Sequence, residues 1–413
     1  MTTITQMGAF AKEASREIAQ QPVVKRNAIL KQMAASLMAN TQMILSANQA
    51  DLEAASALSG PMLNRLTIDQ EALKGIADGI LFLVDLKDPL AGPNPSWQHR
   101  SGFEIVKKTV PLGVVAMVYE ARPNVTADAA ALAIKSGNAV ILRGGKEAIR
   151  TNQALATVLR EALSKEGMNP NALQLIEDTT HESVNELLRL REYVDVLIPR
   201  GSKAFIDFVV EDARVPVIET GAGNTHLFVD DSADQEKAIR VIVNAKTSKP
   251  AVCNAAEKVL VHEAIASDFL PKLMTALIKA GVEVRGDTTA QAIDQRVQPA
   301  VAADWAEEYN DLILAVKVVG DVQEAINWIN RYSTHHSETI LSENPEHVAA
   351  FMQDVDAAVV YQNVSTRFTD GFEFGFGAEI GISTQKLHAR GPMSLSALTT
   401  IKYEVFGDGQ IRE

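Results

Sequence analysis

The spacing of hydrophobic positions changes near residue 100. Up to about residue 80, apolar residues recur three and four positions apart, as in Ala28–Met38, which is the spacing of an amphipathic helix. After a stretch with three prolines, two short alternating runs follow, near Phe103–Val110 and Val114–Val118. The chain is therefore predicted to begin with helices and to continue into strands.

Beyond this point, predicted strands and helices take turns. The predicted strands are Ala139–Leu142, Val194–Ile198, Val215–Ile218 and Lys258–Val261, and the predicted helices are Thr151–Glu166, Lys203–Glu211 and Gln235–Ala245. Strands that alternate with helices of about ten residues or more indicate an α/β protein with parallel sheets and crossover helices.

Length and charge narrow the class of protein. A chain of 413 residues exceeds a single hydrophobic core, so two or three domains are expected. The net charge of -13 argues against binding to nucleic acid or to anionic membranes. The first residues lack a basic segment followed by an apolar one, and apolar stretches such as Leu112–Tyr119 are too short to span a bilayer. With a single cysteine, these features predict a cytoplasmic enzyme.

The single cysteine, Cys253, is the first candidate for chemistry. One cysteine forms neither an intramolecular disulfide nor a thiolate metal cage, so it is either a small core residue or a nucleophile. It follows a polar loop with Lys246 and Lys249 and precedes the apolar run Val259–Val261. Nearby cations stabilise a thiolate, which favours the nucleophile.

Two strand-to-helix junctions are candidates for phosphate binding. Arg143–Lys146 follows a predicted strand and could direct backbone amides and a lysine at an anion, although it lacks the spacing of a P-loop. In Pro199–Ser202, Gly201 allows a tight turn, Ser202 is a candidate N-cap, and the helix start attracts anions. An ordinary turn is the alternative at both places. No Gly-x-Gly-x-x-Gly stands between a predicted strand and a predicted helix.

The pair His335-His336 suggests a metal site at first sight. Neighbouring side chains point in different directions, and the spacing identifies no third ligand, so no metal is expected. A substrate-binding or structural histidine is the better interpretation. The polar loop Gln362–Thr369 carries Arg367 and could bind an anionic substrate or form a solvated turn.

Motifs spread over most of the chain match those of one known family. The matching segments are Val110–Val115, Tyr119–Val125, Gly137–Glu147, Leu197–Gly201, Asn244–Thr247, Cys253-Asn254, Ser333–Glu338, Asn363–Gly371 and Thr384–Pro392. Together they resemble the glutamate-5-semialdehyde dehydrogenases, also called gamma-glutamyl phosphate reductases, of the aldehyde dehydrogenase superfamily. The family usually has a histidine where this chain has Trp328, but the neighbouring His-Ser-Glu matches.

The resemblance implies an activity. Members of the family use NADPH to reduce L-glutamyl 5-phosphate to L-glutamate 5-semialdehyde with release of phosphate, the second step of proline biosynthesis. Cys253 falls on the nucleophile position, where its thiolate would form a thioester that hydride then reduces. The site residues implied are Cys253 as catalyst, Arg122, Asn124, His336 and Arg367 for the substrate, and Arg143, Lys146, Gly201, Ser202 and Glu308 for NADP.

Two positions depart from ordinary aldehyde dehydrogenases. Ala121 stands where those enzymes have an oxyanion-binding asparagine, so the backbone amide of Cys253, with Asn124 or Arg122, is the candidate donor. Glu219 resembles the base that activates hydrolytic water, which a phosphate-releasing enzyme does not need. A general aldehyde dehydrogenase and a non-catalytic binding protein are the alternatives, but the first should have the asparagine and the second should have lost the thiol.

The expected architecture follows that of the superfamily. A Rossmann-like NADP-binding domain covers residues 1–225, with 102–110 contributing to a small β oligomerisation extension. A catalytic domain with Cys253 covers residues 226–365, and residues 366–413 return to the cofactor domain and add a C-terminal strand at Ile401–Phe406. A homodimer or homotetramer is expected, with glutamate 5-kinase as a metabolic partner.

Overall fold

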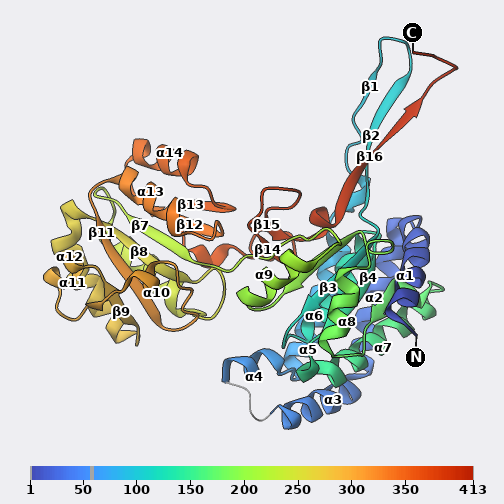
Figure 1. The fold of residues 1–413 in the computed structure, drawn as a ribbon, viewed down its shortest axis with the longest axis horizontal. Coiled ribbons are helices and arrows are strands. Elements are labelled where there is room, and N and C mark those ends of the chain that lie inside the picture. Colours follow the sequence, from blue (N-terminus) through green and yellow to red (C-terminus); the bar gives the residue numbers. More distant parts are fainter. Residues whose placement is uncertain (1, 56–59, 413) are drawn as a thin grey trace. The chain divides into compact units, whose positions relative to one another are not determined.

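A computed structural model describes residues 2–55 and 60–412, and these divide into two compact units (Figure 1). Unit 1 comprises the described residues up to Glu219, together with Gly375–Gly381 and those from Met393 onward. Unit 2 comprises Thr220–Phe374 and Ile382–Pro392. The chain thus enters unit 2 twice, at Thr220 and at Ile382, and returns to unit 1 after each passage. Within the described residues, every helix is too short or too polar to cross a membrane.

Unit 1 is built on a four-stranded parallel sheet of order β5-β4-β3-β6. The strands are β3 (Val114–Tyr119), β4 (Ala139–Gly144), β5 (Leu173–Leu175) and β6 (Val196–Arg200). Every residue of β3 and β4 is buried, as expected for a parallel sheet that is covered on both faces. The strand predicted at residues 215–218 is wrong, because Val217 makes only an isolated bridge to Leu197.

Helices surround this sheet. The crossover helices α6 and α7 and the N-terminal α1 pack against its strands, and α2, α3 and α5 pack on these helices. Thr3 and Gln6 form a capping box that starts α1, and Asp69 caps α5. The helices are α1 (Ile4–Ala19), α2 (Val23–Ala39), α3 (Thr41–Ala54), α4 (Gly60–Leu66), α5 (Gln70–Asp85), α6 (Asn124–Lys135), α7 (Ile149–Lys165), α8 (His181–Leu188) and α9 (Lys203–Asp212).

A separate antiparallel ribbon extends from the helices of unit 1 (Figure 1). It consists of β1 (Ser96–Gln98), β2 (Glu104–Pro111) and β16 (Thr399–Phe406), in the order β1-β2-β16. The strands predicted near 103–110 and 401–406 are therefore confirmed and lie side by side. Exposed apolar side chains gather on this ribbon at Trp97, Ile401, Tyr403, Val405 and Phe406.

Unit 2 contains a seven-stranded parallel sheet of order β10-β9-β11-β8-β7-β12-β13. The strands are β7 (Thr225–Val229), β8 (Ala256–His262), β9 (Glu283–Gly286), β10 (Gln298–Pro299), β11 (Ile313–Val319), β12 (Ser337–Leu341) and β13 (Val359–Gln362). A further two-stranded sheet joins β14 (Gly381–Ser383) to β15 (Gly391–Met393).

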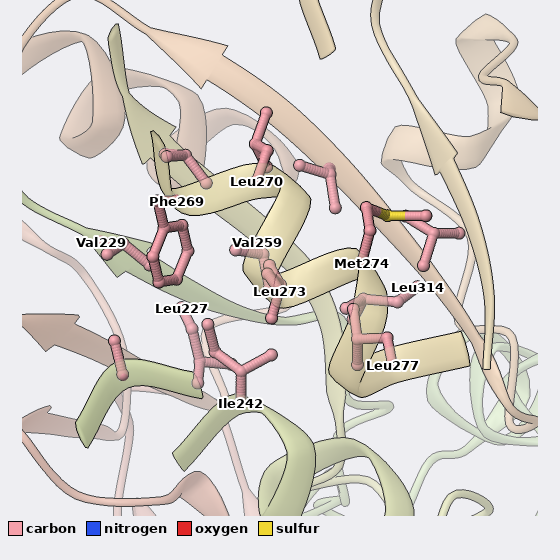
Figure 2. Packing of buried hydrophobic residues seen from close by; sticks show 14 of the residues in the cluster. Leu227, Val229, Ile242, Val259, Phe269, Leu270, Leu273, Met274, Leu277 and Leu314 are labelled. Atoms are coloured by element: carbon pink, nitrogen blue, oxygen red, sulfur yellow. The ribbon is translucent and has the colours of Figure 1, made fainter. Parts of the chain in front are cut away.

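Alternate side chains of these strands face two hydrophobic cores, because side-chain direction alternates along a strand. On one face, Leu227 and Val259 pack with residues of α10 (Gln235–Thr247), α11 (Glu263–Lys279) and α12 (Thr288–Ile293) (Figure 2). On the other, Phe228 and Leu260 pack with residues of α13 (Val322–Tyr332) and α14 (Pro345–Asp354). Both faces of the sheet are therefore covered, which leaves its edges and strand ends for function.

Candidate functional site

Four residues of unit 2 stand shortly before four adjacent strands. Gly223 precedes β7, Cys253 precedes β8, Glu308 precedes β11 and His336 precedes β12. In the sheet these strands follow one another in the order β11-β8-β7-β12. Because the strands are parallel, their amino ends share one edge, and the four residues come together there although they are distant in the sequence.

Cys253 lies in a tightly packed turn at this edge. Its side chain is partly exposed, so it is not a core residue. A Cβ atom placed on Gly223 would lie 1.5 Å from the carbonyl oxygen of Cys253. Thr225 Oγ1 donates a hydrogen bond of 3.3 Å to the same oxygen. The backbone at residue 223 therefore passes so close to the cysteine that only glycine fits there.

Arg367 is the cation beside the cysteine. It lies in the short 3₁₀ helix Thr366–Phe368, and its guanidinium donates to Asn254 Oδ1 and, at 3.0 Å, to Ser248 Oγ. Burial lowers the pKa of Arg367, and the charges of Cys253 and Asp370 oppose that lowering. The guanidinium of Arg367 thus binds the residue next to Cys253 and offers a positive charge near its sulfur.

His336 belongs to a chain of hydroxyl groups that reaches the same loop. Its buried imidazole contacts Ser337 Oγ through Nδ1 at 2.8 Å, and Ser337 Oγ lies 2.7 Å from Thr369 Oγ1. Tyr361 OH lies 2.9 Å from Thr369 Oγ1. His335 points elsewhere, with Nδ1 against the carbonyl of Asp356. The two histidines therefore have different partners, as expected for neighbours in a chain.

Glu308 is held against the backbone next to the cysteine. Its Oε1 atom accepts a hydrogen bond of 2.8 Å from the N–H of Gly223. This bond leaves the second carboxylate oxygen, Oε2, for a further donor, because a carboxylate accepts at both oxygens.

The candidate residues of unit 1 lie at the carboxyl ends of β3, β4 and β6, whereas those of unit 2 lie at the amino ends of strands. The chain leaves β3 for β4 on one side, whereas β6 lies on the other side, so strand order reverses between β3 and β6. Open α/β sheets bind ligands at such a reversal. Arg122 and Asn124 follow β3, Lys146 follows β4, and Gly201 and Ser202 follow β6.

The turn after β6 binds the carboxylate of a residue of the same chain, Glu120. Glu120 accepts a hydrogen bond of 2.9 Å from the N–H of Ser202, at the start of α9. A Cβ atom on Gly201 would lie 2.7 Å from Glu120 Oε2 and would fill this space. Ser202 is the N-cap residue as predicted, but its side chain makes no capping bond. The N–H group at the start of α9 thus binds a carboxylate of the chain itself, as helix N-termini bind anions.

The loop after β4 is held by a buried arginine. Arg143 donates hydrogen bonds to the carbonyl of Thr180 at 2.9 Å and to that of Gly144 at 3.3 Å. Burial lowers its pKa, while Glu147 and Asp178 oppose the lowering. Lys146, in contrast, is exposed. Arg143 thus shapes the loop that presents Lys146.

The turn after β3 is conformationally demanding. Ala121 has a positive φ of 37°, which is uncommon for a residue other than glycine, and its N–H donates to Glu147. Asn124 opens α6 and donates to Asp128 Oδ2 at 3.0 Å. Burial raises the pKa of Asp128 to about 6, although Asn124 and Arg200 oppose it. The predicted substrate residues thus divide between the units: Arg122 and Asn124 belong to unit 1, and His336 and Arg367 to unit 2.

A carboxylate-histidine cluster lies at the other end of the unit 2 strands. Asp230, Asp231 and His347 offer ligand atoms within 4.8 Å of one another. Asp230 already accepts hydrogen bonds from Ser342 at 2.6 Å and from Ser232 at 2.7 Å. These internal bonds account for the cluster, and we assign no metal to it.

Sequence reasoning missed two features of the unit 2 edge. Gly223 stands in the short sequence Gly221-Ala222-Gly223, which matches no binding motif, and its importance comes from the close approach to Cys253. Glu257 and Lys258, adjacent charges in the buried strand β8, were also missed. In the sequence, these two charged residues could have been noticed because they stand directly before the apolar run Val259–Val261.

Comparison with known proteins identifies the class first. The sequence profile of the aldehyde dehydrogenase family matches residues 2–308. An acetylating aldehyde dehydrogenase from Geobacillus thermoglucosidasius has the same fold, with a TM-score of 0.70 at 16% identity over 98% of this chain and 97% of that one.

Closer relatives identify the branch. Gamma-glutamyl phosphate reductase of Leuconostoc mesenteroides is 66% identical over 100% of both chains, and that of Oenococcus oeni is 58% identical over 99% of this chain and 98% of its own. The crystal structure of the Thermotoga maritima enzyme of that name superposes with a TM-score of 0.96 at 45% identity, covering 99% of each chain. The chain therefore belongs to the aldehyde dehydrogenase family and, within it, to the gamma-glutamyl phosphate reductases.

Proposed function

We propose that this enzyme reduces L-glutamyl 5-phosphate to L-glutamate 5-semialdehyde with NADPH and releases phosphate, as the second step of proline synthesis from glutamate. The observation that carries the proposal is the partly exposed Cys253 beside Arg367, in a chain that aligns over its full length with gamma-glutamyl phosphate reductases. A lone thiol next to a cation suits attack on an acyl phosphate.

The chemistry follows from the thiolate. The sulfur of Cys253 forms a bond to the acyl carbon, the bond from that carbon to the phosphate oxygen breaks, and phosphate leaves with the bonding electrons. The resulting thioester accepts a hydride, which is what NADPH supplies when bound. The hemithioacetal then collapses to aldehyde and restores the thiolate. The backbone amide of Cys253 is the proposed donor to the developing oxyanion, with Asn124 or Arg122 as further candidates.

The assay that tests this function runs the reaction backward, with glutamate semialdehyde, phosphate and NADP. Formation of NADPH that depends on phosphate supports the proposal. A general aldehyde dehydrogenase uses water instead, so NADPH formation that is independent of phosphate contradicts it. Ala121 in place of the oxyanion asparagine already disfavours that alternative. Glu219 has no water to activate in this scheme, and we leave it without a catalytic role.

Arg367 and Arg122 are proposed to bind the anionic substrate together with His336. We expect Arg367→Ala or Arg122→Ala to raise the KM for phosphate or semialdehyde by about tenfold to a hundredfold, because a hydrogen bond to a charged group contributes about 1.5–3 kcal/mol. The KM for NADP should change little. The control is Arg331→Ala, which removes an exposed arginine of unit 2. Wild-type kinetics in both variants would place the anion site elsewhere.

Lys146 is proposed to select NADPH over NADH. NAD-preferring enzymes place a carboxylate near the adenosine ribose, where it repels a 2′-phosphate, whereas this loop presents an exposed lysine. Lys146→Glu should lower the ratio of kcat/KM for NADPH to that for NADH by at least about tenfold. Lys165→Glu is the matched control, because it changes an exposed lysine at the end of α7. Equal efficiency of the wild type with both cofactors would contradict this assignment.

The other predicted NADP-binding residues and the oligomer complete the proposal. Gly201 and Ser202 would bind the pyrophosphate, Arg143 would support the loop, and Glu308 would hold the nicotinamide ribose. The apolar side chains on the β1-β2-β16 ribbon support a homodimer or homotetramer formed through it. Glutamate 5-kinase supplies the acyl phosphate and is the proposed metabolic partner in the cytoplasm.

A further inference from the structure

Two adjacent charged residues of β8 are buried in unit 2. Glu257 and Lys258 are 1% and 0% exposed, and neighbouring positions on a strand direct their side chains to opposite faces of the sheet. Both nevertheless reach one loop. Lys258 Nζ donates to the carbonyl of Glu307 at 2.7 Å, and Glu257 Oε2 accepts from the N–H of Tyr309 at 3.2 Å. The residue between these two anchored peptide groups is Glu308.

Further contacts hold the same loop. The ammonium of Lys258 lies 4.4 Å from the centre of the Tyr309 ring, and Tyr309 OH donates to Asp304 Oδ1 at 2.8 Å. Asp304 accepts from Arg285 at 2.8 Å. The loop is therefore fixed by charged and aromatic groups on both sides of Glu308.

A third charge completes the network. Lys246, fully buried at the end of α10, lies 3.2 Å from Glu257 Oε1. Burial raises the pKa of Glu257 to about 7, and the nearby charges of Lys246 and Lys258 do not fully offset it. Burial also lowers the pKa of Lys258 to about 8. The cost of removing these charges from water thus exceeds their mutual attraction. Apolar residues of similar volume often stabilise a fold as much as a buried ion pair does. The network is therefore better explained by the geometry that it imposes than by stability.

We propose that Glu257 and Lys258 are positioning residues, which hold the backbone on both sides of Glu308 so that its carboxylate faces the nicotinamide end of the cofactor at a set distance from Cys253. The same carboxylate accepts from the N–H of Gly223, whose backbone touches Cys253, so the position of Glu308 is tied directly to that of the nucleophile. This inference rests on the proposed function, because it takes NADPH as the ligand of Glu308.

A double-mutant cycle separates positioning from a structural role. Lys258→Met, Glu308→Gln and the double variant are compared in the semialdehyde, phosphate and NADP reaction, and NADPH binding is measured separately by quenching of protein fluorescence. We expect K258M to lower kcat on the order of tenfold, because a misplacement of about 1 Å can cost about 10²-fold. If Lys258 acts through Glu308, the double variant will be no slower than E308Q alone.

Controls address folding and charge. Lys317→Met removes another largely buried lysine, which lies on the neighbouring strand β11 and pairs with Asp287 and Glu324. This variant should leave kcat near the wild-type value. Lys258→Arg keeps a cationic donor and should recover much of the rate. If K258M does not fold, Glu257→Leu takes its place in the same cycle.

The outcomes are distinct. The positioning role would be overturned if the losses of kcat in K258M and E308Q multiply in the double variant. An unchanged kcat in K258M would overturn it as well. A wild-type protein that forms no NADPH from semialdehyde and phosphate would instead refute the proposed function. In that case the cycle is scored on the NADPH dissociation constant alone, and additive changes in that constant would overturn the positioning role as well.

Discussion

Replacing Cys253 by serine is expected to remove nearly all activity and to leave the fold intact. A serine hydroxyl is not ionised at neutral pH, whereas the proposed mechanism takes the thiolate of Cys253 as the attacking group. Because Cys253 is partly exposed, the exchange is tolerable for packing, and the thermal unfolding midpoint should stay close to that of the wild type. We expect kcat to fall by at least about 10³-fold, measured in the phosphate-dependent reverse reaction.

The chain itself supplies a control for this prediction. Because Cys253 is the only cysteine, one equivalent of iodoacetamide should inactivate the wild type, and mass spectrometry should find a single modified residue. Substrate should protect against the modification, and the serine variant should not react. A serine variant that retains more than about 5% of the wild-type rate would remove Cys253 from the proposed mechanism.

Gly223→Ala should impair both activity and stability, although it adds only a methyl group. The new Cβ atom would lie 1.5 Å from the carbonyl oxygen of Cys253, so the backbone of one segment must move. Overpacking costs about 1–3 kcal/mol in typical cores, and here the obstacle is backbone, which cannot rotate away. The displaced segments carry Cys253, the proposed nucleophile, and the N–H of Gly223 that binds Glu308. We expect a loss in kcat of at least about 10²-fold, together with a lower midpoint of unfolding.

Gly320→Ala is the matched control in the same unit. At that position the nearest atom to an added Cβ is the end of the Glu324 side chain, 3.4 Å away, which can move. This variant should keep the wild-type rate and nearly the same unfolding midpoint. Equal behaviour of the two alanine variants would mean that the close approach at Gly223 does not constrain the site.

Prediction from sequence worked best where a pattern is repeated over many residues. The predicted helix at 203–211 corresponds to α9, whose apolar periodicity marks its buried face. The predicted strand at 258–261 lies within β8, where a short apolar run marks a strand that is buried on both faces. The failure at 215–218 has a local cause. Pro216 has no N–H to donate, so this apolar segment meets β6 only briefly, through Val217, and forms no ladder.

The sequence by itself determined that the chain is an α/β protein and that its one cysteine is the candidate nucleophile, since both follow from local spacing and residue identity. Family motifs supported Arg367 and His336, which the local sequence had already raised, and added Glu308 as a candidate. Only the tertiary structure decided that these residues meet, because the sheet order β11-β8-β7-β12 differs from the order of the strands in the chain. The fit of Gly223 against Cys253, and the reach of Glu257 and Lys258 to the loop of Glu308, are likewise contacts between segments far apart in sequence, which no local pattern records.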